Sequence, residues 1–590
     1  MKPIETSGSK RWPPTPAGRA ARGKVLVLGS DDRSFLSVVR SLGRRDLEVH
    51  VAWCDPEAPA LRSRYLHRHH DIPRYRPDDP RWKSQLIDLL ASQMFDLVVP
   101  CHDEDLLPLQ LNGAELSRYA RLCILEDGVY RIVANKALSH ELALSLGVPV
   151  PAQVLVTKPD DLLGLGERLG WPMILKPRFS VHESEPAVKM RVEWAHTADQ
   201  LSRLGTLMLQ RDKPVVVQKH VRGRGEGVEV LCKDGRVLVA FQHERVHEPR
   251  HGGGSSYRRG VPLDASMLGA TRNLMAALRY TGVAMVEYKR DKVSDEWFFV
   301  EINGRFWGSL PLAIASGVDF PYYLYQMMVE GRTEFSQAYR SNLFCRNLIN
   351  DLGWYRQNRK VDPNDPSQIG VTIGHTAREL GNLVLLRERS DTLAVDDPLP
   401  AASQISQLLG KALRRARRWA RARLAGLGVL RSLSRTRVLS ALKSGGVLLI
   451  VCKGNVCRSP YAQRVAARVL PSSVRIRSVG YFPVSGRRSP PEAVAVARSR
   501  GTDLADHESR VIDDKSAGEA DAIAVFDDEN REQLVERYPH LRKKVFYLGA
   551  FLKKGGLLIP DPWGGTIGDF QQAYDRIDRA LEEMAARLRR

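Results

Sequence analysis

The stretch from Val447 to Leu470 restricts what this chain can fold into more than any other part of it. Five apolar residues, Val447 to Val451, predict a buried strand that runs directly into Cys452. Five residues separate this cysteine from Arg458, and Ser459-Pro460 then opens a helical stretch, since proline is tolerated in a first helical turn. The sequence therefore predicts a short loop held between a strand and a helix N-terminus.

Such a loop is suited to hold a phosphate dianion beside a thiolate. Its backbone N–H groups can turn inward, and the helix N-terminus adds positive potential that favours the nucleophilic thiolate of Cys452. The guanidinium of Arg458 can bind two phosphate oxygens, and Ser459 can donate a hydrogen bond to the thiolate. The alternative is a buried cysteine beside an unrelated arginine, which the flanking strand and helix disfavour. The remaining loop residues are Lys453, Gly454, Asn455, Val456 and Cys457.

The full string resembles the low-molecular-weight protein tyrosine phosphatases, and the resemblance covers residues 446–590. Ser478–Gly480 and Ala522–Asp527 look like two further strands of that family. Asp561, in Ile-Pro-Asp-Pro-Trp, looks like its general acid, which would protonate the leaving oxygen before water hydrolyses a phosphocysteine. Trp563 stands where the family usually has tyrosine, so an aromatic wall remains but specificity for phosphotyrosine is less certain. The resemblance implies a phosphotyrosine protein or a small aryl phosphate as substrate.

Basic residues are concentrated in one part of the chain. The net charge is +21, and between Pro398 and Pro491 there are nineteen Lys and Arg but no Asp or Glu. Leu409, Leu413 and Leu424 recur at helical spacing among the arginines, which predicts a basic amphipathic helix. We expect a solvated linker, or a helix that lies on an anionic membrane surface. Nucleic acid is not favoured, because aromatic residues do not alternate with the charges.

Length and composition set wider limits. A chain of 590 residues is expected to hold three or four domains. It has no apolar run of the ~18 residues needed to span a membrane, and its first 23 residues lack the apolar core of a secretory signal. Seven scattered cysteines fit a reducing compartment. We therefore expect a cytoplasmic protein, with peripheral membrane association left open.

The front half alternates predicted strands and helices, which indicates a parallel α/β sheet. The expected strands cover residues 24–30, 47–53, 96–100 and 122–125. Three histidines, His67, His69 and His70, suggest either a metal site or a solvated basic loop, and the loop is the favoured interpretation.

A β-hairpin is predicted at residues 283–303, where two apolar runs flank a polar turn. Glu287 and Glu301 lie equally far from the turn, so their carboxylates should share a face. Asn303 is two residues beyond Glu301 and should point the same way. Two carboxylates and an amide oxygen are the hard ligands that Mg²⁺ prefers. The alternative is a surface hairpin with charged neighbours.

These residues resemble the ATP-grasp superfamily over about residues 24–400. Glu301-Ile-Asn303-Gly-Arg305 looks like its metal motif, with Arg305 stabilising the transferring phosphoryl group. Lys136 and Lys176 match the two lysines that contact ATP phosphates. The stretch from Val215 to Val221 resembles the strand that binds adenine, and it contains three expected ATP-binding residues, Gln218, Lys219 and Val221.

The loops of this half differ from the ATP-grasp pattern in their glycines. The loop after Lys176 lacks the usual glycines, and Arg178 or Ser180 would have to compensate. Gly223, Gly225 and Gly227 predict a turn or, as the less favoured alternative, a phosphate loop. The stretch 251–256 is expected to be a mobile substrate loop or a plain connector.

The expected architecture is α/β throughout: an ATP-grasp half with an N-terminal parallel sheet and a two-lobed ATP-binding region, a basic helical linker, and a doubly wound phosphatase. The domain limits are a disordered tail 1–23, then 24–125, 126–330, a helical extension 331–400, the linker 401–445 and the phosphatase 446–590. The resemblance implies ATP and Mg²⁺ or Mn²⁺ as cofactors, and a small carboxylate and an amine as substrates. Alternatives for the front half are a phosphotransferase and an ATP-sensing module that regulates the phosphatase.

Overall fold

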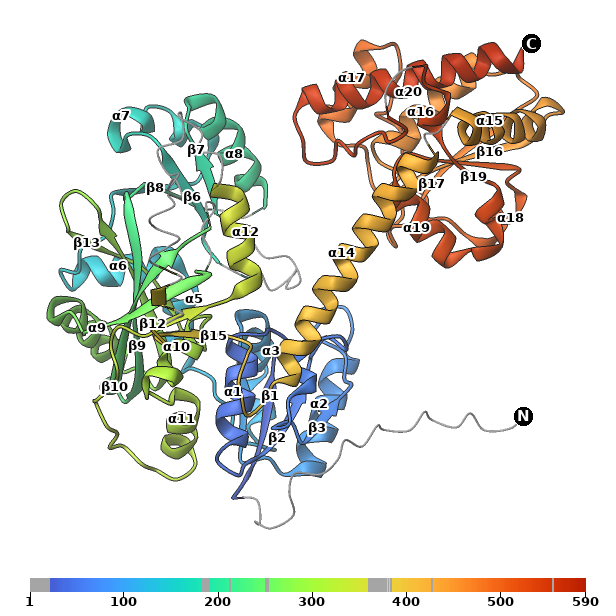
Figure 1. The fold of residues 1–590 in the computed structure, drawn as a ribbon. Helices are drawn as coiled ribbons and strands as arrows, with labels where there is room; N and C mark the ends of the chain where they lie inside the picture. Colours follow the sequence, from blue (N-terminus) through green and yellow to red (C-terminus); the bar gives the residue numbers. More distant parts are fainter. Residues whose placement is uncertain are drawn as a thin grey trace, which may run out of the picture. The chain divides into compact units, whose positions relative to one another are not determined.

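The computed structural model of the chain divides into two compact units, residues 1–406 and 407–590, which we call the front unit and the C-terminal unit. Each is described by itself (Figure 1). The structure describes residues 22–179, 181, 192–211, 214–249, 254–358, 379, 381–382, 385–425, 428–553 and 556–590. Three sequence predictions fall wholly or partly outside this range. They concern residues 1–21 of the expected tail 1–23, Ser180, and residues 251–253 of the expected substrate loop. No helix within it is both long and apolar enough to cross a bilayer.

The front unit begins with a four-stranded parallel sheet whose order is β3-β2-β1-β4. The paired strands β1 and β4 are largely apolar and buried, as the sequence predicts. The expected strand at 122–125 is wrong: it forms only an isolated bridge from Leu122 to Val98. The strands are β1 (Lys24–Leu28), β2 (Glu48–Ala52), β3 (Arg68–His70) and β4 (Leu97–Pro100), and the helices are α1 (Ser34–Gly43), α2 (Arg81–Gln93), α3 (Asp103–Leu111) and α4 (Gly113–Leu116), with a 3₁₀ turn, η1 (Pro59–Arg62).

A small lobe follows, built on a second four-stranded sheet of order β5-β8-β6-β7. Every pairing in it is antiparallel. The helices α5 (Asp127–Ala134) and α6 (Lys136–Ser145) lead into it. Its elements are β5 (Gln153–Val156), η2 (Pro159–Leu162), α7 (Leu165–Leu169), β6 (Met173–Pro177), β7 (Glu193–Ala195), α8 (Ala198–Arg211) and β8 (Val215–Lys219).

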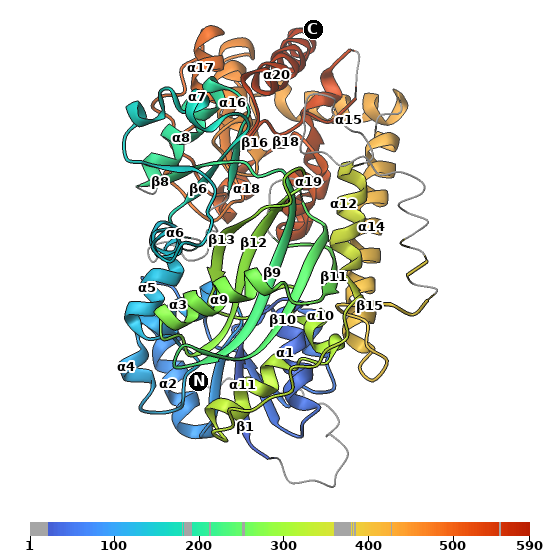
Figure 2. The ribbon, with the colours of Figure 1, turned by 90° about the vertical axis from the view of Figure 1, so that its left-hand side faces the viewer.

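A seven-stranded sheet of order β13-β12-β9-β10-β11-β14-β15 forms the large lobe, and Figure 2 shows its long strands in green. Alternate residues of β9 (Gly223–Lys233) face opposite sides: Val228, Val230 and Cys232 pack with α9 (Ala265–Ala277), whereas Leu231 joins the core shared with the N-terminal sheet. The other elements are β10 (Arg236–His247), β11 (Tyr257–Val261), β12 (Gly282–Asp291), β13 (Trp297–Asn303), α10 (Leu310–Ser316), α11 (Phe320–Met328), β14 (Phe344–Arg346), α12 (Leu348–Asn358) and β15 (Glu388–Ser390).

Two expectations for this lobe differ from the structure. Gly223, Gly225 and Gly227 lie within strand β9, not in a turn or a phosphate loop. Their small size serves close packing, because a Cβ on Gly223 would lie 1.8 Å from the carbonyl oxygen of Arg290. The segment 331–400, expected to be a helical extension, contributes helix α12 but also the strands β14 and β15, which extend the large sheet.

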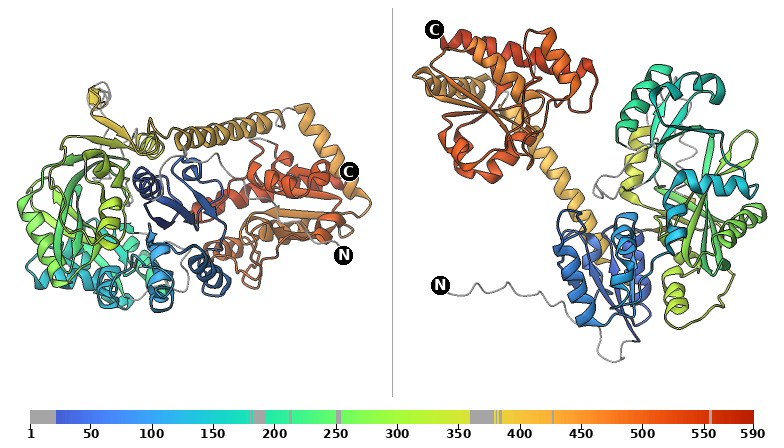
Figure 3. Two further views of the ribbon diagram at one scale, coloured as in Figure 1. Left: turned by 90° about the horizontal axis from the view of Figure 1, so that it is seen from below. Right: turned by 180° about the vertical axis from the view of Figure 1, so that it is seen from behind.

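The basic segment 401–445 forms two helices, α14 (Leu399–Ala425) and α15 (Gly428–Lys443). Figure 3 shows α14 as one long helix. Helix α15 packs on the C-terminal unit: Val438 and Leu442 are buried in its core, and Arg435 Nε donates to the carbonyl oxygen of Ala550 at 2.6 Å. Half of the expected linker is therefore built into the fold that follows it.

The C-terminal unit is a four-stranded parallel sheet of order β17-β16-β18-β19 with helices packed on it. The sheet's two faces bury separate apolar clusters, so it is covered on both sides, as expected for a doubly wound fold. The strands are β16 (Val447–Cys452), β17 (Arg475–Gly480), β18 (Ala522–Val525) and β19 (Val545–Tyr547), and the helices are α16 (Arg458–Val469), α17 (Pro491–Ser499), α18 (Asp514–Glu519), α19 (Asp528–Arg537) and α20 (Ile567–Leu588), with 3₁₀ turns η3 (Pro539–Lys543) and η4 (Leu548–Phe551).

Candidate functional site

The loop between β16 and α16 wraps around the sulfur of Cys452. This thiol ends the strand, is 3% exposed, and accepts a hydrogen bond from the backbone N–H of Asn455 at 3.2 Å. The hydroxyl of Ser459 lies 3.1 Å from the same sulfur. Asn455 adopts a left-handed conformation with φ of 50°, which the tight loop requires. The predicted strand, loop and helix are thus all present around the cysteine.

Side-chain hydrogen bonds hold the loop in this shape. The amide nitrogen of Asn455 donates to Ser459 Oγ at 2.9 Å and to Ser478 Oγ, on the neighbouring strand, at 3.0 Å. The carbonyl oxygen of Asn455 lies 2.7 Å from His507 Nε2. Sequence reasoning did not assign Ser478 or His507 to the site, although Ser478 stands in a strand that it did identify. These contacts hold the loop in the shape that directs the backbone N–H of Asn455 at the sulfur.

Arg458 connects the loop to two aspartates from other parts of the unit. Its guanidinium is 1% exposed and pairs with Asp527 Oδ2 at 2.5 Å and with Asp561 Oδ2 at 2.8 Å. It also donates to the carbonyl oxygen of Ile559 at 3.0 Å. Burial alone would lower the pKa of Arg458, but the charges of Asp527, Asp561 and Cys452 outweigh it and raise the pKa. Asp527 was not predicted as a site residue; its signal is an aspartate directly after the strand next to β16.

The other residues of the loop face different surroundings. Lys453 pairs with Glu529 at 3.1 Å, and the carbonyl oxygen of Gly454 accepts from Arg487 at 2.6 Å. Val456 and Cys457 are buried, and burial raises the pKa of the Cys457 thiol. Trp563, beside Asp561, is 60% exposed, so its ring is available as a wall for a substrate.

In the front unit, the two predicted carboxylates meet as the hairpin requires. Glu287 on β12 and Glu301 on β13 are cross-strand partners, which confirms the predicted pairing. Asn303 Nδ2 donates to Glu287 Oε1 at 3.1 Å and to Glu301 Oε1 at 3.4 Å, so all three share one face. Rotating the amide would direct its oxygen to the same point. This donor set of hard oxygens fits Mg²⁺.

Cations surround these carboxylates. Lys136, the first residue of α6, lies 3.4 Å from Glu301 Oε2, and Arg245 Nη2 lies 2.6 Å from Glu287 Oε1. Burial of Glu301 would raise its pKa, but the charges of Lys136, Lys176 and Arg305 outweigh burial and lower it. Arg245 was missed by sequence reasoning, because it lies on β10, two strands away from Glu287 in the sheet.

The remaining predicted ATP-binding residues lie on the small lobe or next to it. Lys176 on β6 is buried, and burial lowers its pKa to about 8. Gln218 on β8 is 2% exposed and donates to Gln153 Oε1 at 3.3 Å, whereas Lys219 is exposed. Val221 is buried just after β8, where the chain passes into the large lobe. The structure places Lys136 and Lys176 near the carboxylates, since their charges act on Glu301.

Arg305 pairs with Asp103, the first residue of α3 in the N-terminal sheet domain, at 2.9 Å. Burial alone would lower the pKa of Arg305, but the negative charge of Asp103 has the larger effect, so the pKa of Arg305 is raised overall. The predicted phosphoryl-stabilising arginine is therefore anchored by a residue about 200 positions earlier. Asp103 was not predicted as a site residue.

A pocket of about 1100 Å³ opens beside the carboxylates. Its wall includes Glu287, Glu301 and Asn303, the residues of the expected metal site. The facing wall comes from the segments that follow the carboxyl ends of β1, β2, β3 and β4, where ligands of parallel α/β sheets bind. It contributes charged side chains of both signs: Asp31, Arg33, Asp55, Asp71, Arg74 and His102.

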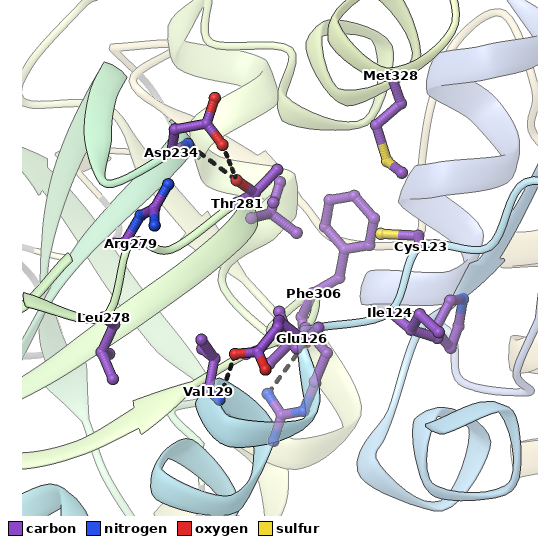
Figure 4. A pocket seen from close by; sticks show the side chains of 16 residues that line it. Cys123, Ile124, Glu126, Val129, Asp234, Leu278, Arg279, Thr281, Phe306 and Met328 are labelled. Carbon is purple, nitrogen blue, oxygen red and sulfur yellow. Dashed lines mark hydrogen bonds between the residues drawn. The ribbon is translucent and has the colours of Figure 1, made fainter. Parts of the chain in front are cut away.

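A second, smaller pocket of about 390 Å³ shares Phe306 with the first, and Figure 4 shows it. Cys123, Ile124 and Met328 form an apolar side of it, while Asp234 and Thr281 hydrogen-bond to each other on another. None of the three residues of the expected metal site lines it. Arg305 and Phe306 line both pockets.

Comparison with known proteins finds a family match within each of the two units. Residues 447–590 match the family model described as low molecular weight phosphotyrosine protein phosphatase. Over 142 residues the chain is 32% identical to EpsP of Ralstonia nicotianae, a probable low molecular weight protein-tyrosine-phosphatase, and this covers 24% of this chain and 95% of EpsP. The chain belongs to the low molecular weight protein-tyrosine-phosphatase family.

Other members of the phosphatase family match the same part of the chain. The low molecular weight protein-tyrosine-phosphatase Etp of Escherichia coli is 32% identical over 143 residues, again 24% of this chain and 95% of that protein. A protein-arginine-phosphatase of Geobacillus stearothermophilus is 28% identical over 141 residues, 24% of this chain and 95% of that protein.

The front unit matches a different family model, described as ATP-grasp in the biosynthetic pathway with Ter operon, at residues 211–347. The N5-carboxyaminoimidazole synthetase of Staphylococcus aureus, solved with ADP, is similar at a TM-score of 0.45 and 14% identity, covering 62% of this chain and 97% of that one. The chain thus matches both predicted families, with an ATP-grasp model at residues 211–347 and the phosphatase model at residues 447–590.

Proposed function

We propose that the C-terminal unit hydrolyses phosphomonoesters through a phosphocysteine. The sulfur of Cys452 attacks phosphorus, the bond to the leaving oxygen breaks, and Asp561 donates a proton to that oxygen. Water then attacks the phosphocysteine, which releases phosphate and regenerates the thiolate. The observation that supports this most directly is the sulfur of Cys452 at the mouth of the loop, with the buried Arg458 beside it and Asp561 paired to that arginine.

The substrate of this unit is a phosphotyrosine protein or a small aryl phosphate. Trp563 is exposed beside Asp561 and offers a flat surface for an aromatic ring. The printed names of the relatives include both tyrosine and arginine phosphatases, so the N–P bond of phosphoarginine is the competing substrate class. Kinetics of the full chain on matched phosphotyrosine and phosphoarginine peptides test this: a higher kcat/KM on phosphotyrosine supports the proposal, and the reverse order refutes it.

We propose that the front unit uses ATP and Mg²⁺ or Mn²⁺ to activate a carboxylate. A carboxylate oxygen of the substrate attacks the γ-phosphorus, ADP leaves, and an amine then attacks the acyl phosphate and displaces phosphate. Glu287, Glu301 and Asn303 would hold the metal, whose charge offsets that of the phosphates. Lys136 and Lys176 would contact ATP phosphates, and Arg305 would stabilise the transferring group. The adenine would lie along β8, near Gln218, Lys219 and Val221.

The large pocket supports this assignment, because it opens directly beside the metal-site residues and has charged groups of both signs on its wall. These groups are suited to a small polar acid and an amine. The alternatives are transfer of phosphate to a hydroxyl group and sensing of ATP without turnover. Incubating the protein with ATP, Mg²⁺ and pools of acids, amines and alcohols distinguishes them. ADP release that needs both an acid and an amine supports the ligase, release with alcohols supports the phosphotransferase, and ATP binding without turnover supports the sensor.

We also propose that helix α14 binds an anionic membrane surface. Lys411, Arg414, Arg415 and Arg417 are exposed on it, and so are the apolar side chains of Leu409 and Leu413. Basic residues near a bilayer contribute about 1 kcal/mol each, and exposed leucines add apolar insertion. The alternative is a solvated helix that binds neither lipid nor protein.

A further inference from the structure

A carboxylate and three imidazoles gather at one corner of the N-terminal sheet, away from the proposed ATP site of the same unit. Glu48 and His50 alternate on β2, so they share a face, and His67 directly precedes the edge strand β3. Glu48 Oε1 lies 2.7 Å from His50 Nε2 and 3.5 Å from His67 Nε2. One atom from each of these three residues lies within 4.8 Å of the others.

These spacings are close to those of a transition-metal site. Zinc binds imidazole nitrogen at about 2.0–2.1 Å and carboxylate oxygen at about 2.0–2.2 Å, so tetrahedral ligands lie roughly 3.3–3.5 Å apart. The 3.5 Å separation between Glu48 and His67 falls in this range, whereas the 2.7 Å contact between Glu48 and His50 is a hydrogen bond that would have to lengthen when an ion binds. The side chain of His67 is 52% exposed, which gives it room to adjust and gives an ion a route from solvent.

A fourth residue supports His50 from behind. His50 Nδ1 lies 2.8 Å from His70 Nε2, so coordination through Nε2 of His50 leaves its other nitrogen with a hydrogen-bond partner. Metal-binding histidines nearly always have such a partner, which orients the ring.

We propose that Glu48, His50 and His67 bind a divalent transition-metal ion such as Zn²⁺, with His70 as the positioning residue and the fourth coordination position open to solvent. The ion would join β2 to the edge strand β3. Glu48 and Lys24 begin their parallel strands, whereas the large pocket lies at the carboxyl ends of those strands. The site is therefore separate from the Mg²⁺ site, and nitrogen ligands distinguish the two chemically.

The chain contains a second cluster of comparable composition, which is a weaker candidate. His247 lies 2.6 Å from both Asp351 and Glu379, all three buried. Arg346 already pairs with both of these carboxylates. One arginine therefore binds both carboxylates there, whereas the described ion pairs of Glu48 are with the two histidines and, at 3.4 Å, with Lys24.

Lys24 gives the proposal a second, opposite test. Its Nζ lies 3.4 Å from Glu48 Oε1, and the side chain is 29% exposed. This ammonium competes with an ion for the carboxylate and repels it. Removing the charge should therefore strengthen metal binding, while removing a ligand should weaken it.

Equilibrium dialysis of the full chain against Zn²⁺ tests the site. Excess Mg²⁺ is present to fill the hard-oxygen site, and every protein carries Cys452→Ser, which removes the reactive thiolate as a competing zinc ligand. The parent should bind one equivalent of Zn²⁺ more than His67→Ala and Glu48→Gln, or bind that equivalent at least about tenfold more tightly. Changes to the residues that support metal ligands have effects of this size. His69→Ala is the matched control, a neighbouring histidine outside the three, and should behave as the parent. Lys24→Met should bind more tightly.

Thermal unfolding of the same proteins gives an independent readout. Zn²⁺ should raise the Tm of the parent and of His69→Ala but not that of His67→Ala, because only binding to the folded state stabilises it. The Tm without metal should be equal in all three, since His67 is half exposed. Equal zinc affinity in parent and His67→Ala would overturn the proposal, as would a loss in His69→Ala equal to that in His67→Ala. Unchanged or weaker binding by Lys24→Met would contradict Glu48 as a ligand.

Discussion

Arg458 Nη2 lies 2.8 Å from Asp561 Oδ2, so the arginine of the phosphate-binding loop is also the ion-pair partner of the proposed general acid. In the proposed mechanism, phosphate and Asp561 would therefore compete for one guanidinium. Binding of a phosphoryl group would weaken the pair and free the carboxyl group to move to the leaving oxygen. Substrate binding and positioning of the acid would thus be linked through one side chain.

Replacing Asp561 by asparagine should slow hydrolysis most for substrates with poor leaving groups. A general acid contributes about 10²- to 10⁴-fold, and good leaving groups need little of it. Rates on aryl phosphates of graded leaving-group pKa measure this. Asp575→Asn, which alters a pair with Arg500 elsewhere in the unit, is the control and should leave the rates unchanged. Equal losses across all leaving groups would remove Asp561 from the acid role.

Asp527→Asn should reduce kcat/KM on aryl phosphates by about 10- to 100-fold, because small misplacements of a binding group have effects of this size. Asp527 pairs with Arg458 at 2.5 Å and also accepts the backbone N–H of Asn530 at 2.7 Å as the cap of α19. Asparagine keeps the cap. The Tm should therefore stay near that of the parent while KM rises, and a fall in Tm with unchanged KM would show that the residue is only structural.

Glu301→Ala and Asn303→Ala should abolish Mg²⁺-dependent use of ATP by the front unit. Aryl-phosphate hydrolysis by the C-terminal unit should continue, because a thiolate mechanism needs no metal. A chelator should likewise silence only the first activity. ATP turnover and aryl-phosphate turnover, measured on the same preparation, check this. Loss of both activities in a folded variant would show that the two units are coupled.

Binding of ATP should weaken as the pH rises through about 8. Burial lowers the pKa of Lys176 to about 8, so the positive charge that would contact phosphate is lost above that value. Between pH 8 and the ordinary lysine pKa of 10.5, the unfolded chain binds more protons than the folded one, so the contribution of Lys176 to stability rises with pH. The two pH trends are therefore opposite in sign.

ATP affinity measured from pH 7 to 9.5 tests the role of Lys176. The variant Lys176→Arg should flatten the profile, since arginine stays charged throughout. Lys158→Arg, on an exposed lysine of the same lobe outside the proposed nucleotide site, should retain the pH dependence of the parent. An unchanged profile in Lys176→Arg would assign the pH dependence to another group.

The protein should sediment with phosphatidylserine vesicles at low salt and be released at high salt, because exposed charges are screened over about 10 Å at 0.1 M. Replacing Lys411, Arg414, Arg415 and Arg417 by glutamine should prevent binding without altering either activity. Phosphatidylcholine vesicles are the control. Equal behaviour with neutral and anionic vesicles would leave α14 as a solvated helix.

Local patterns in the sequence were enough to predict the loop from Cys452 to Arg458 and the hairpin that carries Glu287 and Glu301. The strand that ends at Cys452 and the helix that begins at Arg458 are neighbours in the chain, so apolar runs and Ser-Pro predict them. Cross-strand pairing in a hairpin follows from distance to the turn, which placed Glu287 opposite Glu301. The same reasoning failed at residues 122–125, where an apolar run forms a single bridge, and at Gly223, where tight packing against a neighbouring strand imitates a turn signal.

The tertiary structure alone decided which charged groups meet. Asp527 with Arg458, Asp103 with Arg305 and Arg245 with Glu287 are partners far apart in sequence, brought together by strand order and loop placement. Periodicity reports only which face a residue takes on its own element, and it carries no information about the element that packs opposite. The same limit explains His50: its alternation with Glu48 is visible in the sequence, but its meeting with His67 depends on the edge strand joining β2.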